Sequence, residues 1–263
     1  MPLHTMRRLT LSCLLAVCTA SAYAATPAEL NGIFHKEVTR KLTLPEGATK
    51  HYLDTALEQL HAKGADLSRD QMLVTVDRNP NVQALVLFAG NDKDGWHFVG
   101  ASPVSTGTKG RFDHYVTPTG VYDHTLTDYS DFRAEGTKNE YGIRGYGKRG
   151  MRVWDFGWVP ADKGWLKNRK ESGDIRFQMH ATDPDRLESR LGTTASKGCV
   201  RMSTTLNAFL DKYGALDWHY EQAATQGKTP WVLKKDRVST GHAGRYLVVL
   251  DSEVDARPSW AAR

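Results

Sequence analysis

Short runs of β-branched and apolar residues, separated by strong turn signals, set the first constraint on the fold. Residues 72–76, 84–88 and 96–99 each have the composition of a strand. Between them lie Asn-Pro-Asn at 79–81 and Asn-Asp-Lys-Asp-Gly at 91–95. Runs of this length, bounded by Asn, Asp, Pro and Gly, are typical of hairpins. We therefore predict an antiparallel β core in this part of the chain.

Further regular elements are predicted on both sides of these strands. Three more runs have strand character, at 175–180, 230–233 and 246–250. Another candidate, 116–122, contains Pro118, which favours a turn or a sheet edge over a central strand. Residues 204–213 are predicted to be a helix because their apolar side chains recur on one face. Apolar residues at helical spacing also follow Tyr52 and end before Gly64, a typical helix stop.

Glycine, charged and aromatic residues are frequent between 132 and 175. This segment is too apolar for a disordered linker, and its glycines allow the chain to approach a ligand closely. We predict that it forms either a binding loop or lid, or an irregular packed hairpin.

The first 24 residues have the composition of a secretory signal peptide. Arg7 and Arg8 precede an apolar run at 9–17, and small residues lead to the sequence Ala-Tyr-Ala at 22–24. A membrane anchor is the alternative, but the apolar run is well short of the roughly 20 residues that span a bilayer. We predict residues 1–24 to be cleaved, leaving no membrane span and a periplasmic or cell-envelope protein that begins near Ala25.

Cleavage would leave one cysteine. Of the three cysteines, Cys13 and Cys18 lie in the leader, so Cys199 alone remains. Exported proteins normally pair their cysteines or avoid them, because the periplasm is oxidising. An unpaired thiol there is a filler in the core, a partner in an intermolecular disulfide, or a reactive group.

The charge of the chain is mildly basic. The leader removes two of the 35 basic residues and none of the 30 acidic ones, so the formal charge falls from +5 to +3. The chain has no basic run of the kind that binds nucleic acid, and we predict no nucleic-acid partner. A small positive charge is compatible with an anionic wall polymer.

His180 and Cys199 are the candidate catalytic residues. His180 is predicted to end a strand, and residues 196–199 to form a tight turn just before a helix, where free backbone N–H groups favour a thiolate. Positive charge from His180 or Lys197 would lower the pKa of the thiol further. One cysteine and scattered histidines do not have the spacing of metal ligands, so no metal site is predicted. A papain-like peptidase has the opposite order, with the cysteine first.

These residues resemble the catalytic signature of the L,D-transpeptidase (YkuD-like) family. That signature is a histidine, about fifteen residues, then Ser/Thr-His-Gly-Cys, a hydrophobic residue, and Arg or Asn. Here it reads His180, fifteen residues, and Ser-Lys-Gly-Cys-Val-Arg at 196–201. The similarity extends to Thr-Pro-Thr-Gly-Val-Tyr at 117–122 and Tyr-Gly-Ile at 141–143, and it covers about residues 70–250.

The resemblance implies a mainly β fold, a β-sandwich or barrel with a few short helices. We expect a helical N-terminal segment at 25–69, the catalytic domain at 70–250 and a tail at 251–263. It also implies an exported, cofactor-free peptidoglycan enzyme that releases D-alanine from tetrapeptide stems through a cysteine thioester. The acceptor would be the amine of another stem, giving a 3-3 crosslink, or a lysine of an outer-membrane lipoprotein. The alternatives are an L,D-carboxypeptidase of the same fold and a non-catalytic wall-binding module.

Site roles follow from the resemblance. His180 would accept the thiol proton of Cys199 and pass it to the leaving amine, with the Ala181 carbonyl orienting the ring. Three consecutive main-chain N–H groups would form the oxyanion hole: Lys197, Gly198 and Cys199. Arg201 and Ser196 would bind substrate, although an arginine at this place equally suits a structural ion pair.

One residue departs from the family pattern. Lys197 stands where the family usually has histidine, and an ammonium group offers fixed positive charge without an acceptor atom. This change leaves His180 as the base and leaves the acyl acceptor open. Lys197 otherwise contributes only its backbone from an exposed position.

Overall fold

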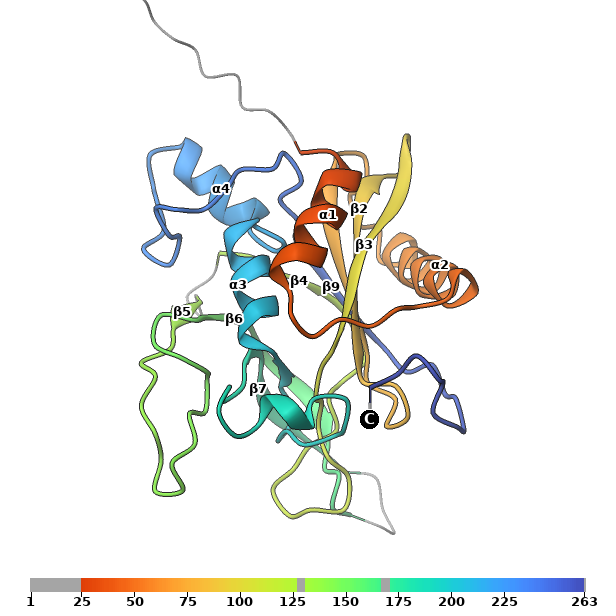
Figure 1. Cartoon of the computed structure of the whole chain (residues 1–263), viewed down its shortest axis with the longest axis vertical. Coiled ribbons are helices and arrows are strands. Elements are labelled where there is room, and N and C mark those ends of the chain that lie inside the picture. The colour runs from red at the N-terminus through yellow and green to blue at the C-terminus, as the bar shows by residue number, and fades with distance from the viewer. Residues whose placement is uncertain (1–24, 127–130, 167–170, 263) are drawn as a thin grey trace, which may run out of the picture.

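The computed structural model describes residues 25–126, 131–166 and 171–262, so the predicted signal peptide lies outside the described residues. Two β-sheets and four α-helices make up the fold (Figure 1). The first sheet has the order β3-β2-β1-β9-β4, with β1 Gln71–Asp77, β2 Ala84–Asn91, β3 Gly95–Pro103, β4 Gly120–Asp123 and β9 Tyr246–Leu250. The second has the order β5-β6-β7-β8, with β5 Phe132–Arg133, β6 Arg152–Asp162, β7 Ser172–Ala181 and β8 Val200–Met202. The helices are α1 Pro27–Glu37, α2 Glu46–Ala62, α3 Thr204–Lys212 and α4 Trp218–Thr225, with a short 3-10 turn at Glu188–Arg190.

This architecture confirms the mainly β fold with short helices and a helical N-terminal segment. The two sheets pack as a sandwich, and the described residues form no closed barrel. Among the helices of these residues, none has both the length and the apolar character needed to cross a bilayer.

The antiparallel strands predicted within 72–99 are confirmed, because β2 pairs in antiparallel orientation with both β1 and β3. Each sheet as a whole, however, is mixed. β9 pairs with β1 in parallel, and β8 pairs with β7 in parallel, while the other strand pairs are antiparallel. A parallel pair needs a long connection between its strands. Such connections join distant parts of the sequence, so a pattern of local hairpin signals does not reveal them.

The first sheet is covered on both faces. Because strand side chains alternate, one face contributes Val74, Leu87 and Leu247 to a core shared with α1, α3 and the second sheet. The other face contributes Leu73, Phe88 and Val248 to a second core beneath α2. Figure 1 shows α1 and α2 on opposite sides of this sheet. All of β1, β2 and β9 is therefore buried.

Local capping explains where the helices begin. Thr26 and Glu29 form a reciprocal capping box at α1, and Pro27 occupies the first turn. Ser203 caps α3, which confirms the predicted helix. Gly64, with a φ of +66°, follows the end of α2 as predicted.

Two strand predictions are wrong in whole or in part. Residues 230–233 form a turn, and α4, which was not predicted, precedes them. The candidate at 116–122 is a strand only from Gly120, because Pro118 cannot donate to a ladder. After β9, the described tail forms no helix or strand, and Trp260 packs edge-on against Tyr52 with ring centroids 6.1 Å apart.

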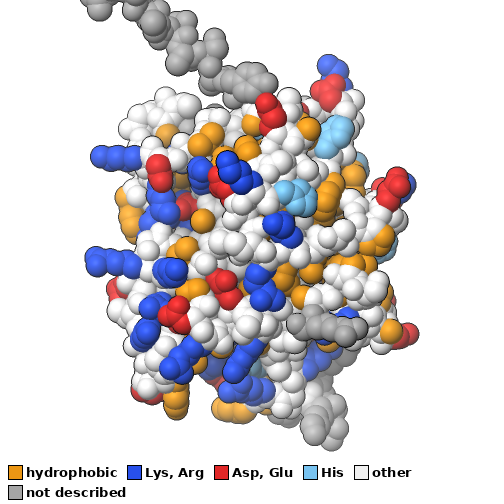
Figure 2. Space-filling model, viewed as in Figure 1, with side chains coloured by type: hydrophobic (Ala, Val, Ile, Leu, Met, Phe, Trp, Pro, Cys, Tyr) orange, Lys and Arg blue, Asp and Glu red, His pale blue; other side chains and the backbone are white. Residues whose placement is uncertain are grey.

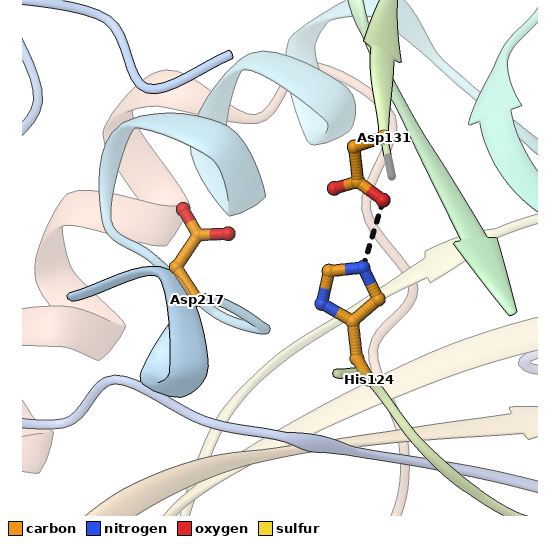
Figure 3. Close-up of side chains that lie close together, drawn as sticks. All are labelled: His124, Asp131 and Asp217. Carbon is orange, nitrogen blue, oxygen red and sulfur yellow. Dashed lines mark hydrogen bonds and ion pairs between the residues drawn. The ribbon is translucent and has the colours of Figure 1, made fainter. Parts of the chain in front are cut away.

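A buried ion network lies between β6 and α4. His124, Asp131 and Asp217 come close enough together to suggest a metal site (Figure 3). However, His124 Nδ1 donates to the Leu216 carbonyl at 2.6 Å, and Nε2 lies 2.8 Å from Asp131. The buried guanidinium of Arg152 bridges Asp131 at 2.6 Å and Asp217 at 3.1 Å. The carboxylates are therefore balanced by Arg152 and protonated His124, and this is an ion-pair network.

The titration of this network follows from its charges. Burial alone would lower the pKa of His124, but the charge and hydrogen bond of Asp131 outweigh burial and raise it. The stability contributed by charged His124 is complete below its unfolded pKa of about 6.5 and is lost as pH rises through the higher folded pKa.

We predict that Asp131→Asn lowers the free energy of unfolding by roughly 3–5 kcal/mol, because it leaves buried Arg152 and His124 without their carboxylate. Urea denaturation at neutral pH measures this change. The control is Asp54→Asn, which breaks the exposed pair with Lys50 and should cost less than about 0.5 kcal/mol. Equal effects from the two substitutions would show that the buried network is not stabilising.

Candidate active site

The parallel pairing of β7 and β8 brings the predicted catalytic residues to one face. His180 pairs with Arg201, so two residues back on the same register Cys199 lies beside Gln178. Side chains of residues two apart share a face of a strand, and neighbours in register point the same way. His180 and Cys199 therefore lie on the same side of the second sheet.

The opposite face of these strands anchors them in the core. Met179, Val200 and Met202 alternate with the site residues and are fully buried in the cluster shared with α1 and α3. Shifting either strand by one residue would place polar site groups in this core. Packing thus fixes which face carries the thiol.

Cys199 is half-buried in the wall of a cavity of about 400 Å³, which we call the thiol cavity. Its lining mixes aromatic, charged and amide side chains: Asp113, Tyr115, Phe132, Tyr146, Ile175, Arg176, Gln178, Lys197 and Cys199.

The turn before Cys199 differs from the prediction. Residues 196–199 lead into β8, and the next helix, α3, begins only at Thr204. The prediction of a helix N-terminus beside the sulfur is therefore wrong. The three-residue strand Val200–Met202 pairs with β7 before Ser203 can start a helix.

Ser196 and Gly198 build this turn. Ser196 is fully buried, and its hydroxyl donates to the Cys199 carbonyl at 2.6 Å and accepts from the Gly198 N–H at 3.0 Å. Ser196, expected to bind substrate, thus has its hydroxyl bonded within the turn, and the Gly198 N–H, one of the three expected oxyanion donors, is bonded to that hydroxyl. Gly198 has a φ of +132°, and an added Cβ would lie 2.7 Å from Ile175. Glycine is required here by backbone conformation and by that contact.

His180 lies at the penultimate position of β7, as predicted, and is 3% exposed. Its Nδ1–H donates to the Ala181 carbonyl at 2.8 Å, which leaves Nε2 as the basic nitrogen. Burial, aided by the charge of Arg201, lowers the pKa of His180 to about 4. The imidazole is therefore neutral at pH 7.

The thiol of Cys199 is also neutral. Burial raises its pKa, and this effect exceeds the opposing influence of the Gln178 backbone and of Arg201. Within the described residues, no hydrogen bond joins Cys199 to His180. The structure therefore does not favour the thiolate expected from the sequence, because the sulfur is desolvated and no helix end faces it.

Sequence analysis missed a chain of three hydrogen-bonded residues beside His180. The ring of Tyr146 packs edge-on against His180 with centroids 4.7 Å apart, and its hydroxyl donates to Gln178 at 3.1 Å. Gln178 in turn donates to Asp155 at 2.8 Å. The main-chain N–H of Asp155 donates to Asp131, so this chain of hydrogen bonds ends in the buried ion network.

The glycine-rich segment at 132–175 contains both predicted structures, a packed hairpin and a loop that reaches the site. Residues 152–181 contain the β6–β7 hairpin, whereas the loop at 134–151 carries Tyr146 to the site. Tyr146 stood out in the sequence as an aromatic residue among glycines. Its contact with His180 depends on the path of the loop, which the sequence does not specify.

Lys197 is exposed and forms an ion pair with Asp113, whose carboxyl pKa is lowered by that hydrogen bond and charge. Both residues line the thiol cavity. The positive charge of Lys197 is thus balanced by a carboxylate.

Arg201 lies half-buried on β8, and its Nη1 donates to the Ala195 carbonyl at 3.1 Å. No described acid forms an ion pair with it. It lines a second cavity of about 520 Å³, which we call the basic cavity, and Lys197 lies between the two cavities because it lines both.

Comparison with solved structures gives remote similarities. The helical cell shape determining protein Pgp2 from Campylobacter jejuni shares 13% identity with this chain, with a TM-score of 0.29. A point mutant of Pgp2 also has 13% identity, with a TM-score of 0.27. The alignments cover 78% and 80% of this chain and 56% and 58% of the Pgp2 chains, so this chain spans less than two thirds of their length. No curated protein matches the chain.

A match to a family of catalytic domains covers more than half of the chain. It includes strands of both sheets and the segment that carries His180 and Cys199. Across residues 72–241 the sequence matches the L,D-transpeptidase catalytic domain (YkuD), and the chain belongs to this family.

Proposed function

We propose that this protein is an exported L,D-transpeptidase that acts on tetrapeptide stems of peptidoglycan through a thioester on Cys199. The observation that carries the proposal is the shared strand face. On this face the half-buried thiol of Cys199 lies at a cavity wall, beside Gln178 of the neighbouring strand. His180 follows Gln178 by two residues, is neutral, and has a free Nε2.

The first step forms a thioester. The sulfur of Cys199 bonds to the carbonyl carbon of the third stem residue, and the thiol proton passes to Nε2 of His180. That proton then goes to the nitrogen of D-alanine as the C–N bond breaks, and D-alanine leaves. In the second step an amine attacks the thioester, loses its proton to His180, and the thiol is restored.

A neutral pair suits this proton transfer. Because thiol and imidazole are both uncharged before attack, the proton moves as the S–C bond forms, and no ion pair between them has to be buried beforehand. The N–H groups of Lys197 and Cys199 are the remaining candidates for oxyanion donors, since the Gly198 N–H is bonded to Ser196.

The acceptor and the place of action follow from the same proposal. The leader at 1–24 would export the chain to the periplasm, where stem peptides lie. An amine of a neighbouring stem gives a 3-3 crosslink, a lipoprotein lysine gives an anchored protein, and water gives carboxypeptidase activity.

We expect Cys199→Ala to abolish both the release of D-alanine from tetrapeptide stems and the formation of any new muropeptide. Mass analysis after incubation with defined stems measures both. Dimers, tripeptides or lipoprotein adducts in the wild-type reaction identify the acceptor. Equal D-alanine release by wild type and Cys199→Ala would show that Cys199 is not the nucleophile.

The raised pKa of Cys199 predicts how the protein reacts with iodoacetamide in the absence of substrate. A group whose pKa lies above its ordinary value has less thiolate at pH 7 than free cysteine has. Alkylation should therefore be slower than that of free cysteine at pH 7 and should increase continuously from pH 6 to pH 9. A chain beginning at Ala25, in which Cys199 is the sole cysteine, allows intact mass to report the rate. A constant fast rate from pH 5 upwards would reveal a thiolate–imidazolium pair and contradict the neutral site.

Tyr146→Phe tests the support of His180. The substitution keeps the ring but removes the hydroxyl bonded to Gln178, and the net value of such a bond is about 0.5–1.5 kcal/mol. We expect kcat to fall roughly 2–10-fold with little change in KM, because the imidazole is held less firmly. Tyr141→Phe, at an exposed tyrosine of the same loop, is the control. Identical kinetics for the two variants would mean that the hydroxyl has no positioning role.

A further inference from the structure

We propose that three aromatic side chains beside the thiol cavity form a sugar subsite, which stacks against the glycan strand that carries the tetrapeptide stem. The three residues are Tyr115, Trp165 and Phe112, and we call them the aromatic strip. The identity of the ligand rests on the proposed function. The position of the subsite rests on the contacts and the exposure of the three rings.

The aromatic strip runs outward from the thiol cavity. Tyr115 lines that cavity, and its ring lies edge-on to Trp165 with centroids 5.1 Å apart. Trp165 is half-buried and meets Phe112 edge-on at 5.6 Å. Phe112 is 80% exposed, the highest value among the large hydrophobic side chains of the described chain. Exposed aromatic surface that continues into a cavity is typical of a ligand-binding groove.

Main-chain hydrogen bonds hold the loop at 107–115 against the segment at 162–166, and these two segments carry the three rings. The N–H of Gly110 donates to the Gly164 carbonyl at 2.7 Å, and the N–H of Gly164 donates to the His114 carbonyl at 3.0 Å. A Cβ at Gly164 would lie 2.9 Å from that His114 oxygen, so glycine is required for this approach. The aromatic strip is therefore one supported surface.

Charged groups of both signs border the strip. Lys163, the bridge partner of Tyr115, forms an ion pair with Glu171 at 3.0 Å. Asp113, which follows Phe112, pairs with Lys197. Figure 1 shows the loop at 107–115 at the lower edge of the molecule, and Figure 2 shows hydrophobic side chains among those of Lys and Arg at that edge.

This mixture of groups fits a sugar. A pyranose ring has a face of C–H groups and a rim of hydroxyl groups. The negative face of an aromatic ring attracts such C–H groups, and charged side chains beside the ring can accept from or donate to the hydroxyls. An apolar peptide would leave these charged groups without hydrogen bonds.

The length of the strip matches the length of the stem. The N–H of Tyr115 donates to the carbonyl of Lys197, which precedes Cys199 by two residues, and two centroid steps of 5.1 and 5.6 Å lead from Tyr115 to Phe112. A stem attacked at its third residue has three residues between the reacting carbonyl and the sugar, and an extended chain spans up to roughly 11 Å over three residues. When the reacting carbonyl lies at the thiol, the sugar therefore reaches the outer part of the strip.

Binding to the Cys199→Ala protein tests the subsite without turnover. Calorimetry compares a disaccharide-tetrapeptide with the same tetrapeptide acetylated at its N-terminus, so that neither probe has a charged amine on its first residue. The disaccharide form should bind at least about 5-fold more tightly, which corresponds to roughly 1 kcal/mol. Adding Phe112→Ala should reduce this gain to less than about 2-fold and leave the affinity for the acetylated peptide unchanged, because the lost ring contacts only the sugar.

Two further variants separate stacking from general effects of substitution. Phe112→Tyr keeps the ring and should keep the gain. Trp231→Ala is the matched control, because Trp231 is 71% exposed and, in the described structure, lines neither the thiol cavity nor the basic cavity.

Three results would overturn the subsite. One is equal affinity of the Cys199→Ala protein for the two probes, and another is a gain that survives Phe112→Ala. The third is an equal gain for a tetrapeptide extended by an apolar dipeptide in place of the sugars, since the strip would then bind peptide.

This proposal and the catalytic proposal fail separately. If wild-type protein releases no D-alanine while the gain that depends on Phe112 persists, the nucleophile assignment fails and the subsite remains. If D-alanine is released but the two probes bind alike, the subsite fails and the catalytic assignment remains.

Discussion

The parallel register between β7 and β8 is the constraint on which the rest of the site depends. It sets Cys199 beside Gln178 and Arg201 beside His180, while the alternate residues are buried in the core. A slip of one residue would exchange the two faces and bury the thiol among apolar side chains. The core thus selects the site geometry, and the short turn built by Ser196 needs only to direct the chain into β8.

A chain of hydrogen bonds extends from this register to the centre of the molecule. It begins at Tyr146, passes through Gln178 and Asp155, and reaches Asp131. Asp131 is held by Arg152 and by His124, both fully buried. Burying these charges costs free energy unless all are paired, so the network has few alternative arrangements. The same hydrogen bonds connect this network to Tyr146, the residue that packs against His180.

Much of this arrangement follows from the sequence, and the remainder has a common physical cause. Local patterns predicted the hairpin strands, the helix at 204–213 and the place of His180 at the end of a strand. These local patterns failed where an element is determined by contact with residues far away in the sequence. β9 pairs in parallel with β1, which lies far earlier in the chain, and Val200–Met202 becomes a strand because β7 offers it an edge. The support that Tyr146 gives to His180 likewise requires a folded loop.

Direct titration of His180 by NMR tests the central claim that, without substrate, His180 and the thiol of Cys199 are both neutral. The account predicts a ring protonated at Nδ1 across neutral pH, with a pKa of about 4 that changes little in Cys199→Ala. A ring that is doubly protonated at pH 7 in the wild type and becomes neutral in Cys199→Ala would contradict it, because that behaviour belongs to a preformed ion pair.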